Sequence, residues 1–284
     1  MLVEKEAGNN YINTDFLKVN SRDCTLLIEF AEEGFSYSIL NNFSNELLYS
    51  SESKSFIDFF QSEELQLLDI FNQEEVFKFS FNKVIVLVNN FYNTLVPTPF
   101  FDENKKKDIL SFNVSLPKVD LIYLTDKIAN IDYYNIYVNT LNFSKVIGNT
   151  FIDVQIKSTV ATLLDYAYNF APKGKFLQVH LSKSKIHCIY FNEGKLEYNN
   201  SFKIDNSEDI IYNVLNIYSQ LGLNTEKMVL HLSGEVTSAD EKYELLYMYI
   251  KNIEFLKRPL KLNYADRVKE IPSHRFVQHF IALL

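Results

Sequence analysis

Residues 26–49 contain three short apolar runs, which read LLIEF at 26–30, FSYSIL at 35–40 and ELLY at 46–49. Turn-forming residues separate these runs, with EEG at 32–34 between the first two and a pair of asparagines after the second. Short runs rich in apolar and aromatic residues, with glycine or asparagine between them, are typical of β-hairpins. The sequence therefore predicts three consecutive antiparallel strands in this stretch.

The same order of features returns in the second half of the chain. The runs there read FLQVHL at 176–181, KIHCIYF at 185–191 and KLEY at 195–198, with the turn NEG at 192–194. In each half a helical pattern follows, and then one unbroken apolar run, VIVLV at 84–88 and MVLHL at 228–232. Such a run suits a strand that is covered on both faces. The sequence therefore predicts an internal duplication.

This duplication predicts an α/β protein of two lobes. Each lobe is expected to hold a mixed sheet, in which parallel strands continue three antiparallel ones and helices flank them. The linker APKGK at 171–175 divides the chain into a loose polar arm at 1–22, a first lobe at 23–172 and a second lobe at 173–284. A helix is predicted over 155–170. The apolar stretch LVPTPFF at 95–101 is expected to be a loop that either plugs the core or forms a patch for a partner.

Composition excludes several classes of protein. Hydrophobic residues make up 47% of the 284, which is enough for a full core and excludes global disorder. The net charge of −8 opposes broad nucleic-acid binding. The first ten residues lack the pattern of a signal peptide and no run is long and apolar enough to span a membrane, so we expect a cytoplasmic protein. Cys24 and Cys188 lie in strand-like runs, where buried free thiols are the simpler interpretation and a disulfide stays open.

The duplicated plan resembles the actin-like ATPase superfamily, which includes sugar kinases, heat-shock chaperones and actin. More narrowly, the chain resembles an uncharacterised Bacteroidetes family known only as a domain of unknown function. The resemblance spans roughly residues 23–284 and implies a ribonuclease H-like fold in both lobes, with a nucleotide cleft between them. In the superfamily, the first hairpin of each lobe carries Asp-x-Gly-Thr/Ser. The acid handles Mg²⁺ or water, and the glycine lets backbone amides approach a phosphate.

The positions that match this motif have lost most of its chemistry. In the first lobe they read EFAE at 29–32, so that Glu29 replaces the aspartate and an alanine replaces the glycine. In the second lobe they read HLSKS at 180–184, without an acid or a glycine. The adenosine-binding turn is matched by LSGE at 232–235. The chain has only 7 glycines and no phosphate-binding glycine loop, so neither ATP nor Mg²⁺ is expected as a cofactor.

The sequence therefore favours a non-catalytic, actin-like pseudo-ATPase that serves as an interaction or scaffold module for a protein partner, with its oligomeric state left open. The alternative is a protein that binds a nucleotide or small ligand in a degenerate cleft between the lobes. The candidate cleft residues are Glu29, Ser182, Lys183, Ser184, Ser233 and Gly234.

A third possibility is a metal site on His180 and His231, completed by His187 or Glu235. Both His180 and His231 precede Leu-Ser near the ends of predicted strands. Hydrogen bonding of each imidazole beside its own sheet is the simpler interpretation, so no metal is expected.

Overall fold

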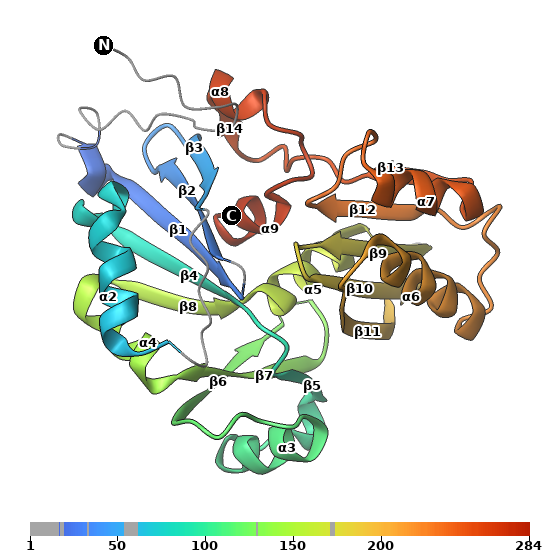
Figure 1. The fold of residues 1–284 in the computed structure, drawn as a ribbon, viewed down its shortest axis with the longest axis horizontal. Coiled ribbons are helices and arrows are strands. Elements are labelled where there is room, and N and C mark those ends of the chain that lie inside the picture. The colour runs from blue at the N-terminus through green and yellow to red at the C-terminus, as the bar shows by residue number, and fades with distance from the viewer. Residues whose placement is uncertain (1–16, 18–19, 33, 54–61, 129, 171–173) are drawn as a thin grey trace.

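The computed structural model describes Leu17 and residues 20–32, 34–53, 62–128, 130–170 and 174–284. Figure 1 shows that these residues form two lobes, each built on one mixed sheet, and a smaller sheet beside the first lobe. The predicted α/β class with two lobes is confirmed. No helix in these ranges is long and apolar enough to cross a membrane.

The sheet of the first lobe begins with the predicted three-stranded meander. Beyond the meander, β4 pairs in parallel with β1 and β8 pairs in parallel with β4, while the late strand β14 pairs in parallel with β3. The order across the sheet is β14-β3-β2-β1-β4-β8. Its strands are β1 (Cys24–Ala31), β2 (Gly34–Asn41), β3 (Glu46–Glu52), β4 (Lys83–Asn89), β8 (Val154–Ser158) and β14 (Asn263–Tyr264).

The second lobe repeats this arrangement. An antiparallel meander is again continued by two parallel strands, in the order β11-β10-β9-β12-β13. Its strands are β9 (Lys175–Leu181), β10 (Lys185–Asn192), β11 (Lys195–Lys203), β12 (Leu230–Gly234) and β13 (Ile253–Phe255). The internal duplication predicted from the two sets of strand-like runs is therefore present.

The smaller sheet lies between β4 and β8 in the sequence and has the order β5-β7-β6. Its elements are β5 (Asn93–Pro97), β6 (Leu121–Lys127), β7 (Tyr133–Thr140) and the helix α3 (Lys106–Asn113). The expectation of a loop at 95–101 is wrong in part, because residues 95–97 pair with β7. Val96 packs into the core of this sheet, whereas Phe100 is 75% exposed.

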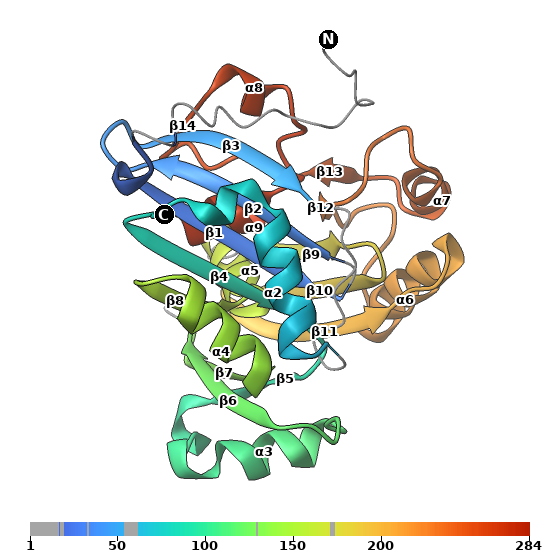
Figure 2. The same cartoon turned by 60° about the vertical axis from the view of Figure 1, so that its left-hand side comes forward.

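Helices cover both faces of each large sheet. Figure 2 shows α2 (Glu64–Gln73) and α4 (Leu141–Thr150) in front of the first sheet, with α5 (Thr159–Phe170) and α9 (Val277–Ala282) behind it. The helices α6 (Ser207–Gln220) and α7 (Glu241–Tyr249) pack together in the apolar core of the second lobe. The other helices among the described residues are short: η1 (Ser21–Asp23), η2 (Glu75–Lys78), η3 (Thr98–Phe100), η4 (Glu103–Lys105) and α8 (Asp266–Lys269). The helix predicted over 155–170 begins only at Thr159, since residues 154–158 form β8.

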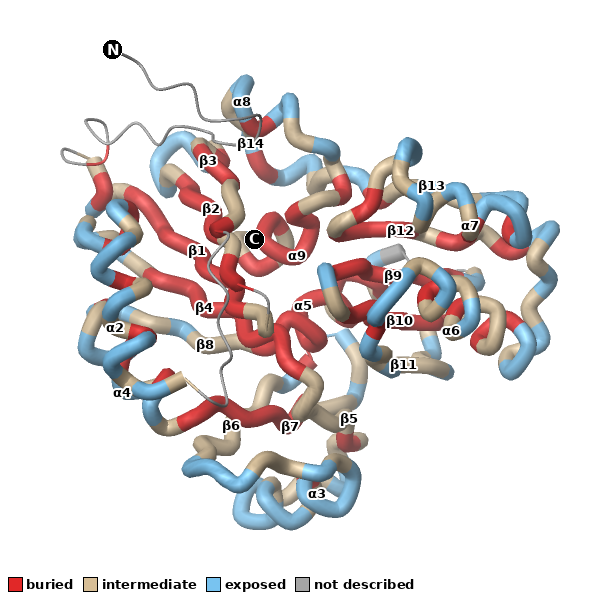
Figure 3. Tube along the Cα trace, in the orientation of Figure 1, coloured by how far each residue is buried: buried red, intermediate tan, exposed pale blue. Residues whose placement is uncertain are grey.

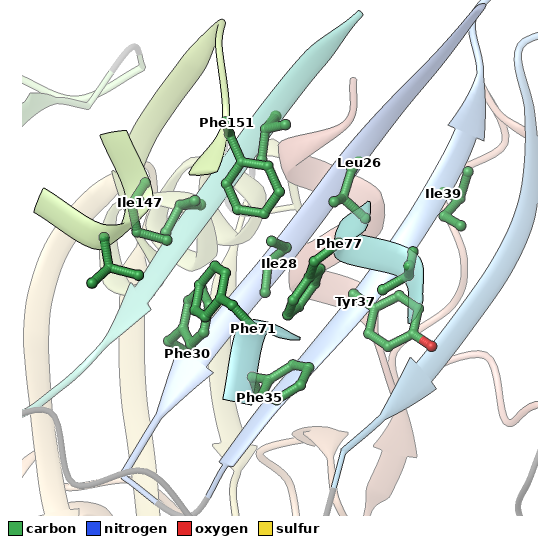
Figure 4. Close-up of a cluster of buried hydrophobic side chains, with 14 of the residues drawn as sticks. Leu26, Ile28, Phe30, Phe35, Tyr37, Ile39, Phe71, Phe77, Ile147 and Phe151 are labelled. Atoms are coloured by element: carbon green, nitrogen blue, oxygen red, sulfur yellow. The ribbon is translucent and has the colours of Figure 1, made fainter. Parts of the chain in front are cut away.

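The alternation of side chains along β1 determines what each face of the first sheet buries. Ile28 and Phe30 point toward α2 and α4, where Phe30 meets Phe71 and Phe143 in a cluster of aromatic rings (Figure 4). Leu27 points to the opposite face and packs against Ala282 of α9. Glu29 lies two residues further along β1 and therefore on the same face as Leu27, so its carboxylate is directed between the lobes. Figure 3 shows that buried residues also run along α5 and α9 between the two sheets.

Candidate functional site

The tips of the first hairpins of the two lobes face each other across a small cavity of about 50 Å³. Its walls come from the ends of β1, β2, β3 and β4 in the first lobe, from β9 and β12 in the second, and from the segment before and within α9. Its lining includes Glu29, Ser36, Glu52, Asn89, His180, Ser182, Lys183, Gly234, Glu235, Arg275 and Gln278. The predicted cleft between the lobes therefore exists, but little space is left in it.

Glu29 is the buried acid of this site, with only 4% of its surface exposed. Its Oε1 accepts hydrogen bonds from Asn89 Nδ2 at 3.1 Å and from Thr159 Oγ1 at 2.9 Å. Its Oε2 accepts from Gln278 Nε2 at 2.6 Å and from His279 Nε2 at 3.2 Å. The carboxylate thus has two donors on each oxygen, and all four come from this chain.

Burial alone would raise the pKa of Glu29, because it disfavours the charged carboxylate. The hydrogen bond and electrostatic interaction with His279, together with the hydrogen bond from Gln278, outweigh burial and lower the pKa of Glu29 to about 2. The group is therefore a carboxylate at neutral pH. Its charge is stabilised by hydrogen bonds from the protein itself, whereas in the superfamily the matching acid binds Mg²⁺ or positions water.

Asn89 links the two lobes at the end of β4. Its Nδ2 donates to Glu29 and lies 3.5 Å from Ser182 Oγ of the second lobe, at the long limit of a hydrogen bond. Its Oδ1 accepts from Nζ of Lys185, a buried ammonium that also lies 3.3 Å from the carbonyl oxygen of Asn90. A carboxylate in one lobe and an ammonium in the other are therefore joined through one amide.

His279 connects Glu29 to a row of serines on β2 and β3. Its Nε2 lies 2.9 Å from Ser36 Oγ, and its Nδ1 lies 2.8 Å from Ser38 Oγ. Ser38 Oγ in turn lies 2.8 Å from Ser50 Oγ. Every member of this row except Ser36 is almost fully buried, so the imidazole is held on both sides by partners in the sheet.

In the second lobe, His180 and Ser233 form the corresponding polar pair. His180 Nδ1 lies 3.0 Å from Ser233 Oγ, and Gln178 Nε2 donates to the same oxygen at 3.3 Å. Gly234 follows at the end of β12 with a φ of +88°, and a Cβ atom there would lie 2.0 Å from the carbonyl oxygen of Leu181. The surviving glycine of the predicted adenosine-binding turn is therefore needed for the close approach of β12 to β9.

The structure brings four of the six predicted cleft residues to one cavity, namely Glu29, Ser182, Lys183 and Gly234. Ser233 lies behind the cavity wall, fully buried against His180. Ser184 does not line this cavity, and its carbonyl oxygen accepts a backbone hydrogen bond from Ile204.

The two histidines suggested for a metal do not share this site. His180 lines the cavity, whereas His231 stacks on Phe176 and lies 3.1 Å from the carbonyl oxygen of Leu177. His187 binds Ser201 Oγ at 2.7 Å, and Glu235 lines the cavity on the side of His180. Among the described residues, no three histidines, cysteines or acids are grouped as a metal would require. Cys24 and Cys188 are both buried and free.

Sequence reasoning missed the residues that hold Glu29. Asn89 had a usable signal, since it directly follows the apolar run of β4, the strand that pairs in parallel with β1. Thr159 similarly follows β8 at the start of α5. Gln278 and His279 had no local signal, because they lie 249 and 250 residues away from Glu29 in the sequence.

This arrangement does not fit a Mg²⁺–nucleotide complex. Pockets for ligands of that size have volumes of about 300 Å³ or more, whereas about 50 Å³ has room for only a few water molecules. Both oxygens of Glu29 are already occupied by donors from the chain.

Two duplicated lobes, joined face to face at their first hairpins, define the fold of the actin-like ATPases. A Bacteroides thetaiotaomicron protein described as having an actin-like ATPase fold and unknown function matches with a TM-score of 0.72 at 22% identity. The match covers 87% of this chain and 94% of that chain. The chain belongs to the family described as "Protein of unknown function (DUF3822)", whose model matches residues 13–253. The resemblance stated from the duplicated strands is thereby confirmed.

A chain of the PilM-PilN type IV pilus biogenesis complex has the same fold, with a TM-score of 0.56 at 12% identity. That match covers 92% of this chain and 98% of the other. No curated protein matches the sequence significantly.

Proposed function

We propose that this protein is a non-catalytic member of the actin-like fold, a pseudo-ATPase that acts as an interaction or scaffold module in the bacterial cytoplasm. The observation that carries the proposal is the occupation of Glu29 by four donors of the same chain. An acid that binds Mg²⁺ or positions water must offer it free lone pairs. The lone pairs of Glu29 already accept hydrogen bonds from the chain itself.

The change in charge at the first hairpin also supports a non-catalytic role. Glu32 stands where the motif of the superfamily has a hydroxyl, and it adds a negative charge near the place of a polyanionic phosphate. The PilM-PilN type IV pilus biogenesis complex is a protein assembly that contains this fold, which agrees with a role in binding a protein partner.

Isothermal titration calorimetry with Mg-ATP and Mg-ADP tests this proposal. We expect no saturable heat of binding at millimolar nucleotide. We also expect that nucleotide does not raise the midpoint temperature of thermal unfolding. A nucleotide present at 100 times its Kd would add about 2.7 kcal/mol of stability. A saturable signal that disappears in Ser182→Ala would contradict the proposal.

The alternative function is binding of a small ligand in the cleft. It is favoured by one observation, the gathering of Glu29, Ser182, Lys183 and Gly234 around a single cavity. A ligand there would have to displace Gln278 or fit into the remaining 50 Å³. A thermal-shift panel of small metabolites tests this alternative. A metabolite that stabilises the wild type, and that stabilises the Lys183→Ala variant less, would support binding in the cleft.

A further inference from the structure

The strand β11 forms an open edge of the second lobe. It is the last strand of its sheet, with β10 as its one neighbouring strand among the described residues. Figure 1 shows β11 at the rim of the lobe. None of its nine residues is buried, and Lys195, Glu197, Asn200 and Lys203 are exposed. A long edge strand presents backbone groups with which a strand of another chain can pair.

The equivalent edge in the first lobe is covered by the chain itself. There β3 takes the place that β11 has in the duplicated unit, and β14 pairs with β3 in parallel. Asn263 N donates to the carbonyl oxygen of Asn45 at 2.9 Å, and Ala265 N donates to that of Leu47 at 3.0 Å. The described part of the chain therefore supplies a strand for one of the two edges and none for the other.

The backbone of β11 directs alternate peptide groups outward. Ile204 N donates to the carbonyl oxygen of Ser184 at 2.8 Å, so its peptide group faces the side of β10. Alternation along an antiparallel strand then directs the peptide groups of Asn199 and Ser201 away from β10. The N–H of Ser201 accordingly bonds to Oδ1 of its neighbour Asn200, at 2.9 Å. A partner strand would meet these outward groups at the open edge.

Opposite charges flank the regular part of β11. The pairing with β10 is continuous from Tyr198 to Lys203, and the register shifts just before Tyr198, at Glu197. The carboxylate of Glu197 accepts a hydrogen bond from Asn192 Nδ2 at 3.0 Å, and Nζ of Lys203 lies 3.3 Å from Asp205 Oδ1. Both contacts are at exposed positions, where such interactions contribute little to stability. The acid and the base are therefore accessible to a partner.

The sequence of β11 is complementary to itself when two copies run antiparallel. If Asn200 stands opposite Asn200 of a second copy, then Tyr198 of each copy stands opposite Phe202 of the other, and Glu197 opposite Lys203. Aromatic pairs and opposite charges stabilise such cross-strand positions. Tyr198 and Phe202 already pack at the border of the apolar core of the second lobe, so their pairing would extend that core across the contact.

The backbone and the charges together select this register. It brings the outward peptide groups of Asn199 and Ser201 opposite each other, whereas a shift by one residue would oppose outward groups to inward ones. A shift by two residues places Lys195 opposite Lys203 in one direction, and Glu197 opposite the acid at 205 in the other. Like charges directly opposite are unfavourable. Because the register is symmetric, the contact uses the β11 edge of both copies and closes as a dimer.

We propose that β11 pairs in antiparallel register with β11 of a second copy of this chain, so that the two five-stranded sheets become one continuous sheet. Interfaces of stable complexes cover about 800 Å² on each partner, and a short ladder covers less, so the dissociation constant is expected on the order of tens of micromolar. The proposal goes beyond the non-catalytic role proposed above, because it does not involve the cavity between the lobes.

Sedimentation equilibrium of the full-length protein at increasing concentration tests the dimer. We expect a reversible equilibrium between monomer and dimer. Lys203→Glu and Glu197→Lys should each weaken the dimer at least tenfold, since like charges then stand opposite at both ends of the ladder. Both side chains are exposed, so the variants should unfold at the same urea concentration as the wild type.

A mixture of these two variants gives the sharpest result. In a mixed dimer, both lysines of one copy stand opposite the two glutamates of the other. We therefore expect the mixture to associate with about the affinity of the wild type, although neither variant associates well alone. Energy transfer between a donor label on one variant and an acceptor label on the other measures this. The double variant Glu197→Lys/Lys203→Glu should associate like the wild type.

Cysteine cross-linking tests the register. Asn200 lies on the symmetry axis, so Asn200→Cys should form a disulfide between two copies when treated with diamide. The control Lys203→Cys is equally exposed but stands opposite Glu197, and should cross-link at least tenfold more slowly. The native cysteines, Cys24 and Cys188, are buried.

A protein that stays monomeric at millimolar concentration would overturn the proposal. So would a dimer that the charge variants do not weaken, a mixture that associates no better than its components, or equal cross-linking of the two cysteine variants. Each of these results leaves the nucleotide calorimetry unaffected, so failure of the β11 contact and failure of the non-catalytic role are distinguishable.

Discussion

Acid is expected to destabilise this protein at pH values where most proteins of its size remain folded. The cause is a pair of buried imidazoles, His180 and His187, which lie opposite each other on β9 and β10 with 3% exposure each. Burial lowers the pKa of His180 to about 4 and the pKa of His187 to about 3. The nearby ammonium of Lys185 contributes to both of these shifts.

The sign and size of the effect follow from these values. The unfolded chain takes up a proton on each ring near pH 6.5, whereas the folded chain takes up none until about pH 4. Stability is therefore complete above pH 6.5 and is lost as the pH falls. At pH 5, each ring costs about 2 kcal/mol, so the pair costs about 4 kcal/mol relative to neutral pH. Glu29 adds little at pH 5, because its contribution is lost only below about pH 4.5.

Urea unfolding followed by circular dichroism at pH 7, 6 and 5 measures this loss. We expect the free energy of unfolding of the wild type to fall by several kcal/mol. His187→Gln, in which the amide can still bind Ser201, should fall by about 2 kcal/mol less. Equal free energies of unfolding at pH 7 and pH 5 would refute this prediction. So would a decrease in His187→Gln as large as that in the wild type. Either result means that the imidazoles take up protons in the folded protein as readily as in the unfolded chain.

Three other outcomes are expected. Gly234→Ala should lower the free energy of unfolding by at least about 2 kcal/mol in chemical denaturation, since its Cβ would collide with Leu181. The control Gly148→Ala, on the open face of α4, should stabilise the protein by about 0.5–1 kcal/mol. Equal effects of the two substitutions would contradict the close approach of β12 to β9. His279→Ala should cost about 1–3 kcal/mol because it removes a hydrogen-bond donor from the buried carboxylate of Glu29. A double-mutant cycle with Glu29→Gln should give a coupling energy above 1 kcal/mol, and additive losses would mean that the two side chains do not interact.

Much of the fold could be predicted because its signals are local. In the hairpins of both lobes, turn residues separate the strand-like runs. The alternation of side chains along β1 already places Glu29 on one face of the first sheet. The resemblance to the actin-like superfamily implies that the second hairpin, with Ser182 and Lys183, lies opposite the first. Four of the six candidate residues that follow from it line the cavity, whereas Ser184 and Ser233 do not.

The elements that sequence reasoning missed depend on tertiary contacts. The strand β8 runs directly into α5 without a turn, and Ile156 continues the helical spacing of Val160 and Leu163. Only the pairing of β8 with β4 makes residues 154–158 a strand. The prolines at 97 and 99 suggested a loop, but β5 is an edge strand with Pro97 as its last residue, where a missing N–H is tolerated.

The pairing of β14 with β3 and of α9 with β1 has a consequence for how the protein is made. These contacts join residues more than 200 positions apart, so the β3 edge of the first sheet and the part of one face that α9 covers stay open until residues 263–282 have been synthesised. Contacts of such long range slow folding and expose apolar surface in the meantime. We expect the nascent first lobe to be a chaperone client on the ribosome, and to become protease-resistant only when its last helix arrives.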